Sequence, residues 1–189
     1  MKNVELYISP TALLVFALLW FFDGSGLYAA AVPAAAVHEL GHALFLWLGG
    51  LSLRSLRLGL FGLEMDYWGC LDGLTGAMVI GAGPAFGLLY AALCLGAEGE
   101  YWRLSGGVSL LLSVFNLLPV LPLDGGRLLA LAAGERAEGI SRVISLAIAA
   151  LGLWLWLDRG WFSLFAMGAW LGWWNCRGLG RARRPRRTK

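Results

Sequence analysis

The chain has 189 residues, of which 59% are apolar and only 14% are charged, and its formal net charge is +3. Soluble domains carry about 25% charged residues, so this composition excludes a disordered chain and argues against a water-soluble globule. It is typical of a polytopic membrane protein. The length fits one domain, and we expect a single membrane-embedded domain over residues 1–189.

Six apolar segments follow one another along the chain: Leu6–Phe22, Leu27–Leu48, Gly73–Gly96, Leu104–Leu121, Ile140–Leu157 and Trp161–Cys176. Several are shorter than the ~20 residues that a straight transmembrane helix needs, which predicts tilted helices or a locally thinner bilayer. We therefore expect an all-α polytopic membrane fold with about six transmembrane helices. The alternative for the first segment is a cleaved signal peptide, which would remove one helix of the six.

Residues 51–67 have a different pattern from the segments around them. Apolar residues alternate with polar or small ones from Leu51 to Arg54 and from Leu56 to Leu60, and again from Leu63 to Tyr67. This period of two favours strands, and Gly59 and Gly62 can supply a turn between them. We expect a short β-hairpin at about 51–67, associated with the cytoplasmic leaflet of the membrane. An irregular loop is the alternative.

The distribution of Lys and Arg predicts the orientation in the membrane. Seven of the 15 basic residues lie in a tail at positions 177–189. In so apolar a chain, such a tail favours a cytoplasmic anchor over a nucleic-acid site. With six spans, thirteen basic residues share the side of the two termini, and only Arg103 and Arg159 lie opposite. We expect a multi-pass protein of the cell membrane with both termini in the cytoplasm.

The second segment contains His38-Glu39-Leu40-Gly41-His42, an HExxH motif that uses both histidines of the chain. On a helix, residues i and i+4 lie on one face, so both imidazoles can bind one metal ion. Glu39 is then placed to act as a general base on water at the metal. The alternative is a pair of buried histidines satisfied by neighbouring groups. It would leave three ionisable groups at membrane depth without a cation, which is energetically costly.

A catalytic zinc site needs three protein ligands and an open fourth position. The chain has no third histidine, and Asp124 is the only acid in the apolar stretch from Asn116 to Gly126. We therefore expect His38, His42 and Asp124 to bind Zn²⁺. A loop acid before a Gly-Gly turn is the alternative for Asp124. The cysteines compete poorly as ligands because they are far apart: Cys70, Cys94 and Cys176.

Two prolines interrupt the end of the fourth segment. Pro119 and Pro122 break regular helix and leave backbone groups that protein or water must satisfy. The broken segment can present Asp124 and offers an edge with which an extended peptide can pair. Asn116 lies one turn before Pro119. It either donates a hydrogen bond to a substrate carbonyl or oxyanion, or caps helix contacts, and the pattern leaves both roles open.

These paired motifs resemble those of a known family. His38-Glu39-x-x-His42, followed by Asn116-x-x-Pro119-x-x-Pro122-Leu123-Asp124-Gly125, is similar to the motif pair of the site-2 proteases, which are intramembrane zinc metalloproteases. The resemblance covers about residues 27–126 and implies a three-helix catalytic core there. The six-segment layout is most similar to the bacterial branch whose sporulation protease processes a membrane-associated pro-sigma factor.

The resemblance also implies roles for individual residues. His38, His42 and Asp124 would bind zinc, Glu39 would be the general base, and Asn116 would help to position the scissile peptide. Ala82-Gly83-Pro84 is similar to an element that family members often carry in the third segment. Gly87, however, stands where many members have Asn, so a role for a polar side chain at this position is not implied.

The function implied is hydrolysis of a peptide bond in a membrane-embedded or membrane-tethered protein near the cytoplasmic face. Regulated proteolysis of a sigma-factor precursor or another signalling protein is an example. A catalytically inactive relative that binds membrane helices, or a metal-ion transporter, is the alternative. The intact Glu39 argues against the first, and the clustering of deep polar groups at one point argues against the second. We expect a bacterial protein whose partners are its membrane-anchored substrate, the lipid bilayer and regulatory membrane proteins, with no nucleic acid. No oligomeric state is predicted.

Overall fold

The computed structural model describes residues 5–59, 62–69 and 71–177. The chain divides into two compact units, Met1–Val114 and Phe115–Lys189. Of the predicted basic tail, only Arg177 lies among the described residues, and Cys70 lies outside them. The expectation of a single domain over residues 1–189 therefore stays a prediction.

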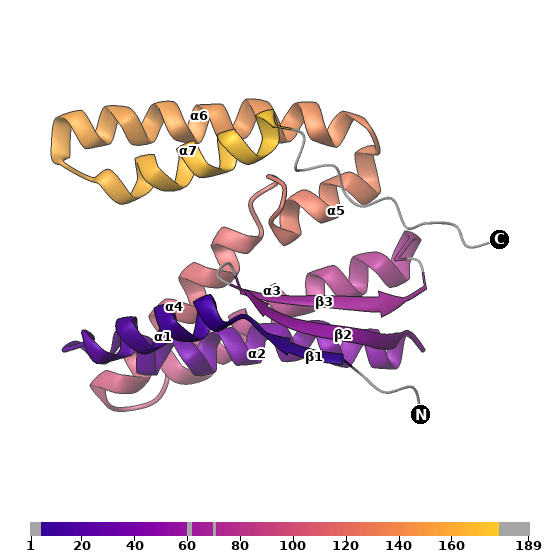
Figure 1. Cartoon of the computed structure of the whole chain (residues 1–189), viewed down its shortest axis with the longest axis horizontal. Coiled ribbons are helices and arrows are strands. Elements are labelled where there is room, and N and C mark those ends of the chain that lie inside the picture. Colours follow the sequence, from indigo (N-terminus) through magenta and orange to yellow (C-terminus); the bar gives the residue numbers. More distant parts are fainter. Residues whose placement is uncertain (1–4, 60–61, 70, 178–189) are drawn as a thin grey trace. The chain divides into compact units, whose positions relative to one another are not determined.

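The first unit combines a small sheet with four helices, which Figure 1 labels in chain order. Its elements are β1 (Glu5–Ile8), α1 (Pro10–Phe21), α2 (Leu27–Leu48), β2 (Ser52–Gly59), β3 (Gly62–Trp68), α3 (Gly73–Leu95) and α4 (Glu100–Asn116). The last two residues of α4 belong to the second unit. The bounds of α2 agree with the predicted segment, and those of α3 agree to within one residue.

The sheet has the strand order β1-β2-β3. Strands β2 and β3 pair antiparallel, with Gly59 opposite Gly62 at the closed end. The two predicted strands are confirmed and the loop alternative is wrong, whereas the association of the hairpin with the cytoplasmic leaflet stays a prediction. Strand β1 pairs parallel with β2, starting at Glu5 opposite Ser55, and was not predicted. The first apolar segment was expected to be helical from Leu6, but its helix starts at Pro10, because proline favours the first helical position.

The helix that carries the HExxH motif has defined signals at both ends. At its start, the Asp23 carboxylate accepts a hydrogen bond from the backbone N–H of Tyr28 at 2.7 Å. At its end, Gly50 adopts a left-handed conformation with φ of 71°. The N–H of Leu51 then donates back to the carbonyl oxygen of Leu46 at 3.0 Å. This pattern is a Schellman motif, and it ends α2 just beyond the motif.

Helix α4 is fastened to its neighbours by buried hydroxyl groups. Ser105, Ser109 and Ser113 recur at every fourth residue, and each is fully buried. The Oγ of Ser105 donates to the carbonyl oxygen of Ala30 on α2 at 2.9 Å, and that of Ser109 donates to Gly87 on α3 at 2.8 Å. Hydrogen bonds of this kind and small residues hold helices together where lipid provides no hydrophobic driving force.

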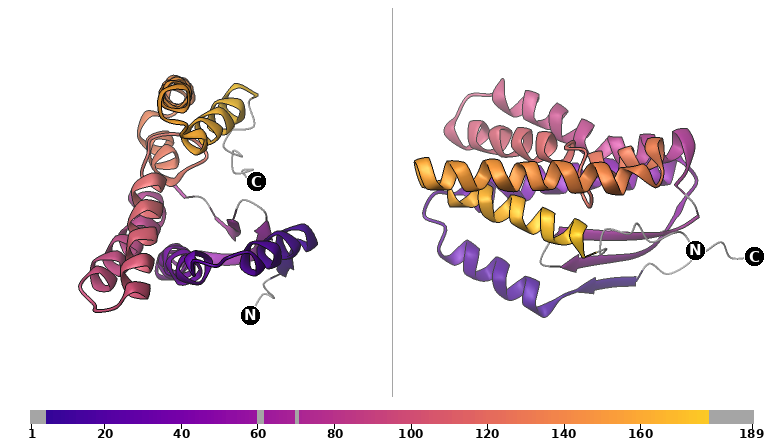
Figure 2. Two further views of the ribbon diagram at one scale, coloured as in Figure 1. Left: turned by 90° about the vertical axis from the view of Figure 1, so that its left-hand side faces the viewer. Right: turned by 90° about the horizontal axis from the view of Figure 1, so that it is seen from above.

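The second unit contains three helices: α5 (Asp124–Ala133), α6 (Arg136–Arg159) and α7 (Phe162–Cys176). Helices α6 and α7 lie side by side, as both views in Figure 2 show. Their backbones approach closely, since a Cβ atom on Gly152 would lie 2.7 Å from the Cα of Phe165, and one on Gly168 would lie 2.7 Å from the Cα of Ala149. Glycine at these positions allows the close contact.

Two features of this region differ from the prediction. The fourth apolar segment was expected to continue to Leu121, but α4 ends at Asn116, because Pro119 and Pro122 cannot continue the helix. Helix α5 was not predicted. Its first three residues, Asp124, Gly125 and Gly126, were interpreted as a loop acid or ligand followed by a turn, whereas the structure has all three within the helix.

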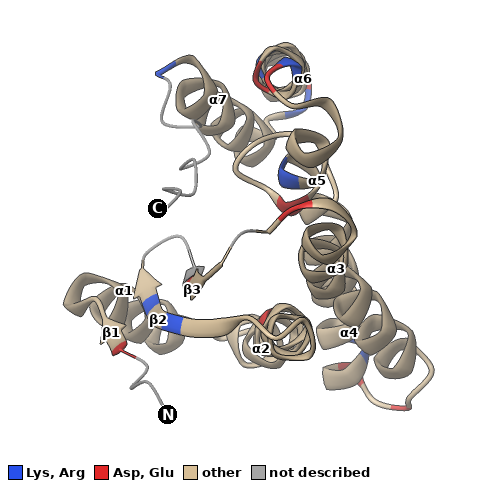
Figure 3. Ribbon diagram, turned by 90° about the vertical axis from the view of Figure 1, so that its right-hand side faces the viewer, with Lys and Arg blue, Asp and Glu red and all other residues tan. Residues whose placement is uncertain are grey.

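The described residues bear out a membrane protein. Helices α2, α3 and α6 are long and apolar enough to cross a bilayer, and α1 is a shorter apolar helix. Figure 3 shows how sparsely charges occur on the helices, and Glu39 is the one charged residue of α2. Large apolar side chains such as Phe21 and Leu157 are more than three-quarters exposed, which a lipid environment explains. The count of six spans stays a prediction.

Candidate metal centre

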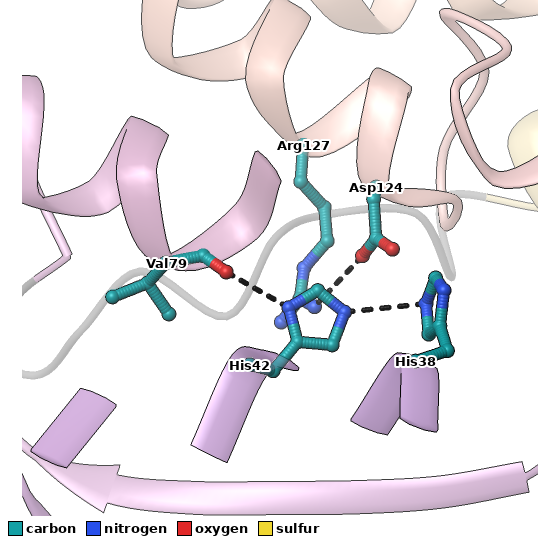
Figure 4. A network of polar contacts seen from close by, with 5 residues as sticks. All are labelled: His38, His42, Val79, Asp124 and Arg127. Atoms are coloured by element: carbon teal, nitrogen blue, oxygen red, sulfur yellow. Dashed lines mark hydrogen bonds and ion pairs between the residues drawn. The ribbon is translucent and has the colours of Figure 1, made fainter. Parts of the chain in front are cut away.

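Helix α2 brings the two histidines of the motif together. His38 is buried and His42 is half-buried, one turn apart on the same face. Their Nε2 atoms lie 3.3 Å apart, and the two rings are nearly perpendicular at 81°. Figure 4 shows these two nitrogen atoms pointing toward each other. The predicted pair therefore presents two nitrogen donors to one point.

The orientation of His42 is set by the neighbouring helix. Its Nδ1 lies 2.8 Å from the main-chain carbonyl oxygen of Val79 on α3. A carbonyl oxygen only accepts hydrogen bonds, so Nδ1 carries the proton and donates it. Nε2 of the neutral ring then keeps its lone pair for a metal ion, the arrangement that metal-binding histidines usually show.

Gly83 provides the space for this ring. It lies one turn after Val79 on α3, and a Cβ atom at this position would overlap Nε2, Cε1 and Cδ2 of the His42 imidazole. Any larger side chain would push the ring away from the position in which it faces His38. The element Ala82-Gly83-Pro84 thus has a physical explanation here: its glycine lets α3 approach the second histidine of the motif.

The geometry of the histidine pair fits zinc. Zinc binds imidazole nitrogen at ~2.0–2.1 Å with tetrahedral angles, so two such ligands lie roughly 3.3–3.4 Å apart. The observed Nε2–Nε2 distance of 3.3 Å agrees with this value. Glu39 is half-buried between the two histidines in the chain, on the turn of α2 that carries them. The pair is thus already arranged for a shared ion.

The second unit contributes a buried carboxylate. Asp124 is the first residue of α5 and only 6% exposed. The guanidinium of Arg127, one turn later, forms an ion pair with its Oδ1 at 3.6 Å, as Figure 4 shows. The positive end of the α5 dipole favours the ionised carboxylate at this position. Asp124 is therefore a structured helix-terminal acid, not an acid in a loop before a turn.

Two glycines hold the first turn of α5 against the preceding segment. A Cβ atom on Gly125 would overlap the carbonyl oxygen of Leu117, and one on Gly126 would overlap the backbone of Val120. Both glycines are buried. The Gly-Gly pair thus serves the close packing of segment 117–123 on α5, and this packing determines how Asp124 is presented.

The donor set suits a metal ion. The group of predicted ligands consists of His38 and His42 of the first unit and Asp124 of the second, and each offers one ligand atom. Two imidazoles and one carboxylate are donors that zinc accepts in catalytic sites, with one position left for water. The cysteines within the described residues, Cys94 on α3 and Cys176 at the end of α7, are not part of the group. The predicted ligands are thus a chemically coherent set.

Asn116 and Gly87 complete the positions that the sequence singled out. Asn116 is half-buried and is the last residue of α4, directly before the segment that leads to Asp124. Its two predicted roles, substrate binding and the capping of helix contacts, both stay predictions. At Gly87, a Cβ atom would overlap the Oγ of the buried Ser113. The hydroxyl of Ser113 therefore occupies the space that a larger residue at this position would need.

Comparisons with known proteins agree with these features. Residues 99–155 match the model of peptidase family M50. The chain is 33% identical over 162 residues to Rip3 of Mycobacterium tuberculosis, and 31% identical over 156 residues to the sll0528 protein of Synechocystis. Both relatives are described as zinc metalloproteases. These matches cover 72% and 67% of the chain but only 41% of each relative, so the chain spans about two fifths of their length.

A solved structure shows the same fold. The site-2 protease from Methanocaldococcus jannaschii superposes with a TM-score of 0.65 over 94% of this chain and 92% of that chain, at 21% sequence identity. The expected kinship to the sporulation branch stays a prediction. The motif pair, the family match and the relatives agree at the level of the family. The chain therefore belongs to peptidase family M50, the family of the site-2 proteases.

Proposed function

We propose that this protein is a zinc-dependent endopeptidase that hydrolyses a peptide bond of a membrane-embedded or membrane-tethered protein. In this proposal His38, His42 and Asp124 bind zinc, and the remaining coordination position is left for water. The observation that carries the proposal is the pair of Nε2 atoms 3.3 Å apart, with one ring fixed by the carbonyl of Val79. The zinc metalloprotease names of the relatives support the choice of metal.

The catalytic roles follow from the chemistry of the side chains. When bound, zinc acts as a Lewis acid that lowers the pKa of water and polarises a carbonyl group. Glu39 accepts the proton of the attacking water and passes it to the leaving amine. Asn116 can donate a hydrogen bond from its amide to the carbonyl oxygen of the scissile peptide. His42 keeps its ring in place through the hydrogen bond to Val79.

The substrate has to reach this site in an extended conformation, because a helix hides its carbonyl groups in internal hydrogen bonds. The β2–β3 hairpin and the segment 117–123 supply backbone that is not helical. An extended substrate segment can pair with such backbone. We therefore propose a substrate with a membrane span that unwinds locally, such as a signalling protein or a sigma-factor precursor anchored to the membrane.

The proposed orientation has both termini in the cytoplasm, which places the chemistry near that face. It is supported by the count of thirteen basic residues against two in a six-span arrangement. A bacterial cell membrane is supported by the two bacterial relatives. Reporter fusions at each terminus and after Arg103 test the orientation, and a cytoplasmic signal after Arg103 would overturn it.

The decisive test is proteolysis in the native membrane. Isolated membranes containing the unchanged protein are compared with membranes containing Glu39→Gln, and newly formed protein N-termini are identified by mass spectrometry. We expect a small set of new N-termini in membrane proteins that depends on Glu39. Glu138→Gln is the matched control, because Glu138 pairs with Arg142 on the partly exposed surface of α6.

The outcomes separate the possible functions. If membranes with the unchanged protein and membranes with Glu39→Gln yield identical new N-termini, the protease assignment is overturned. Retention of the same membrane proteins by both variants without cleavage would instead indicate a binding protein. Zinc flux through proteoliposomes that is equal for both variants would indicate a transporter. A difference confined to Glu39→Gln, with Glu138→Gln behaving as unchanged protein, is the result that we expect.

A further inference from the structure

We propose that Ser141 on α6 and Asn175 on α7 are positioning residues of the metal centre, because together they hold the backbone of Leu121 three residues before Asp124. This inference rests on the proposed function, in which Asp124 is a zinc ligand. It assigns a role to the last two helices, which carry none of the motif residues.

The contacts all lie within the second unit. The backbone N–H of Leu121 donates to Oγ of Ser141 at 3.1 Å. The side-chain amide of Asn175 donates to the carbonyl oxygen of Leu121 at 2.8 Å and to that of Leu171, on its own helix, at 2.8 Å. Both polar groups of the Leu121 backbone are therefore bound by side chains from α6 and α7. We call these two side chains the Leu121 clamp.

The clamp is fully enclosed. Ser141 is 0% exposed, and Asn175 and Leu121 are each 4% exposed. Water does not reach these groups, so each hydrogen bond removed would leave a buried polar group unpaired. The two helices are also tied to each other, since Nε of Arg142 donates to the main-chain oxygen of Asn175 at 3.2 Å. The clamp thus has a rigid frame behind it.

Segment 117–123 depends on such external partners. Pro119 and Pro122 have no N–H to donate, and the segment forms no regular helix or strand. Its local hydrogen bonds are short-range turns, including that from Leu123 to the carbonyl of Val120 at 2.9 Å. Leu121 lies between the two prolines, so the clamp fixes the segment at its centre.

A displacement of Leu121 would reach Asp124 directly. Gly125 and Gly126 lie so close to the backbone of residues 117–121 that no Cβ atom fits between them. The N–H of Arg127 donates to the carbonyl oxygen of Leu123 at 3.0 Å. The segment and the first turn of α5 therefore move together, and a loosened clamp shifts the carboxylate of Asp124.

The chain offers a matched control for the test. Ser145 lies one turn after Ser141 on α6 and is equally buried, but its Oγ donates to the carbonyl oxygen of Arg142 on its own helix. Ser141→Ala and Ser145→Ala remove the same atom from the same helix at the same depth of burial. Only the first removes a contact with Leu121. Asn175→Leu, which keeps the branched arrangement of side-chain heavy atoms but removes the amide, tests the other half of the clamp.

The experiment has two readouts on the purified full chain. The first is amide hydrogen exchange in residues 117–123 without zinc, and the second is zinc affinity measured against a chromophoric chelator. For Ser141→Ala and Asn175→Leu we expect faster exchange in this segment and zinc affinity weakened about 10- to 100-fold, as for other groups that orient metal ligands. For Ser145→Ala we expect the exchange rate and the zinc affinity to stay as in the unchanged protein. We expect the same for Ser141→Thr, because threonine keeps the hydroxyl group.

The results distinguish this inference from the proposed function. Equal exchange and equal zinc affinity in Ser141→Ala and Ser145→Ala would overturn the clamp, even if His38→Ala and His42→Ala lose zinc. If exchange rises while zinc affinity is unchanged, the clamp is purely structural and the positioning role is wrong. If the unchanged protein binds no zinc, the proposed function fails and the positioning role fails with it.

Discussion

His42 donates a hydrogen bond from Nδ1 to the main-chain carbonyl oxygen of Val79, 2.8 Å away on the neighbouring helix. This contact turns Nε2 toward His38 and fixes the tautomer that binds metal. Because the acceptor is backbone, the side chain at position 79 is not constrained by it. The constraint lies instead at Gly83, where the imidazole needs the space.

Gly83→Ala should weaken zinc binding. The new methyl group would overlap the His42 ring and displace Nε2, so we expect zinc affinity to fall at least about 10-fold, in the range typical of changes around metal ligands. The matched control is Gly81→Ala on the same helix, where a Cβ atom meets nothing within 4 Å. Chelator competition measures both, and equal affinity in the two variants would contradict the role of Gly83.

Asp124→Asn should reduce zinc affinity while leaving the protein folded. The amide has nearly the shape of the carboxylate, but it lacks the charge that favours the cation, and Arg127 would lose its ion-pair partner. Asp158→Asn is the control, because Asp158 pairs with Arg159 at the exposed end of α6. Zinc content after dialysis is the measurement. Full zinc occupancy in Asp124→Asn would exclude the carboxylate as a ligand.

Gly125→Ala should destabilise the protein, although alanine usually stabilises a helix relative to glycine by about 0.5–1 kcal/mol. Its Cβ atom would overlap the carbonyl oxygen of Leu117, and overpacking of this kind costs roughly 1–3 kcal/mol. Gly139→Ala on α6, where a Cβ atom has open space, should keep or raise stability. Thermal unfolding of the two variants in the same detergent gives the comparison. A higher melting temperature for Gly125→Ala would show that the close packing of segment 117–123 is wrong.

The start of α2 should depend on pH through Asp23. A hydrogen bond from the side chain of Ser25, helped by backbone N–H groups such as that of Tyr28, lowers the pKa of Asp23. The stabilising contribution of the carboxylate is therefore present above the ordinary aspartate pKa and is lost as the pH falls through the lowered value. Exchange protection of the Tyr28 amide should decrease across this acidic range and lose that dependence in Asp23→Asn. Asp72→Asn is the control, since Asp72 precedes α3 without a side-chain cap. If the Tyr28 amide lost its pH dependence in Asp72→Asn as well, the assignment of this dependence to Asp23 would be refuted.

The parts of the site that were predictable are those encoded by local spacing. The i, i+4 separation of His38 and His42 places both on one helix face whatever surrounds them. The alternation in residues 51–67 predicted the hairpin for the same reason, since a strand exposes every second residue. The family resemblance pointed to Asp124, whose identity as the single acid in an apolar stretch already drew attention to it.

The parts that were missed depend on contacts between distant segments. Helix α5 was not predicted because Asp124-Gly125-Gly126 has the composition of a turn. In the structure, these glycines allow close packing of α5 against segment 117–123. Strand β1 was hidden because its apolar residues run into those of α1, and its pairing with β2 is long-range. The carbonyl of Val79 has no side-chain signal at all. Ser141 and Asn175 belong to no motif, and only the fold brings them to Leu121.

In the proposed centre, the two histidines of α2 bind zinc and a carboxylate completes the protein ligands. X-ray absorption at the zinc edge of the purified protein tests it most directly. We expect one zinc per chain in a four-coordinate shell of nitrogen and oxygen, with two imidazoles at ~2.0–2.1 Å, and loss of one imidazole in His42→Ala. A protein that holds no zinc, or zinc whose shell lacks imidazole and is unchanged in His42→Ala, would contradict zinc binding by these histidines.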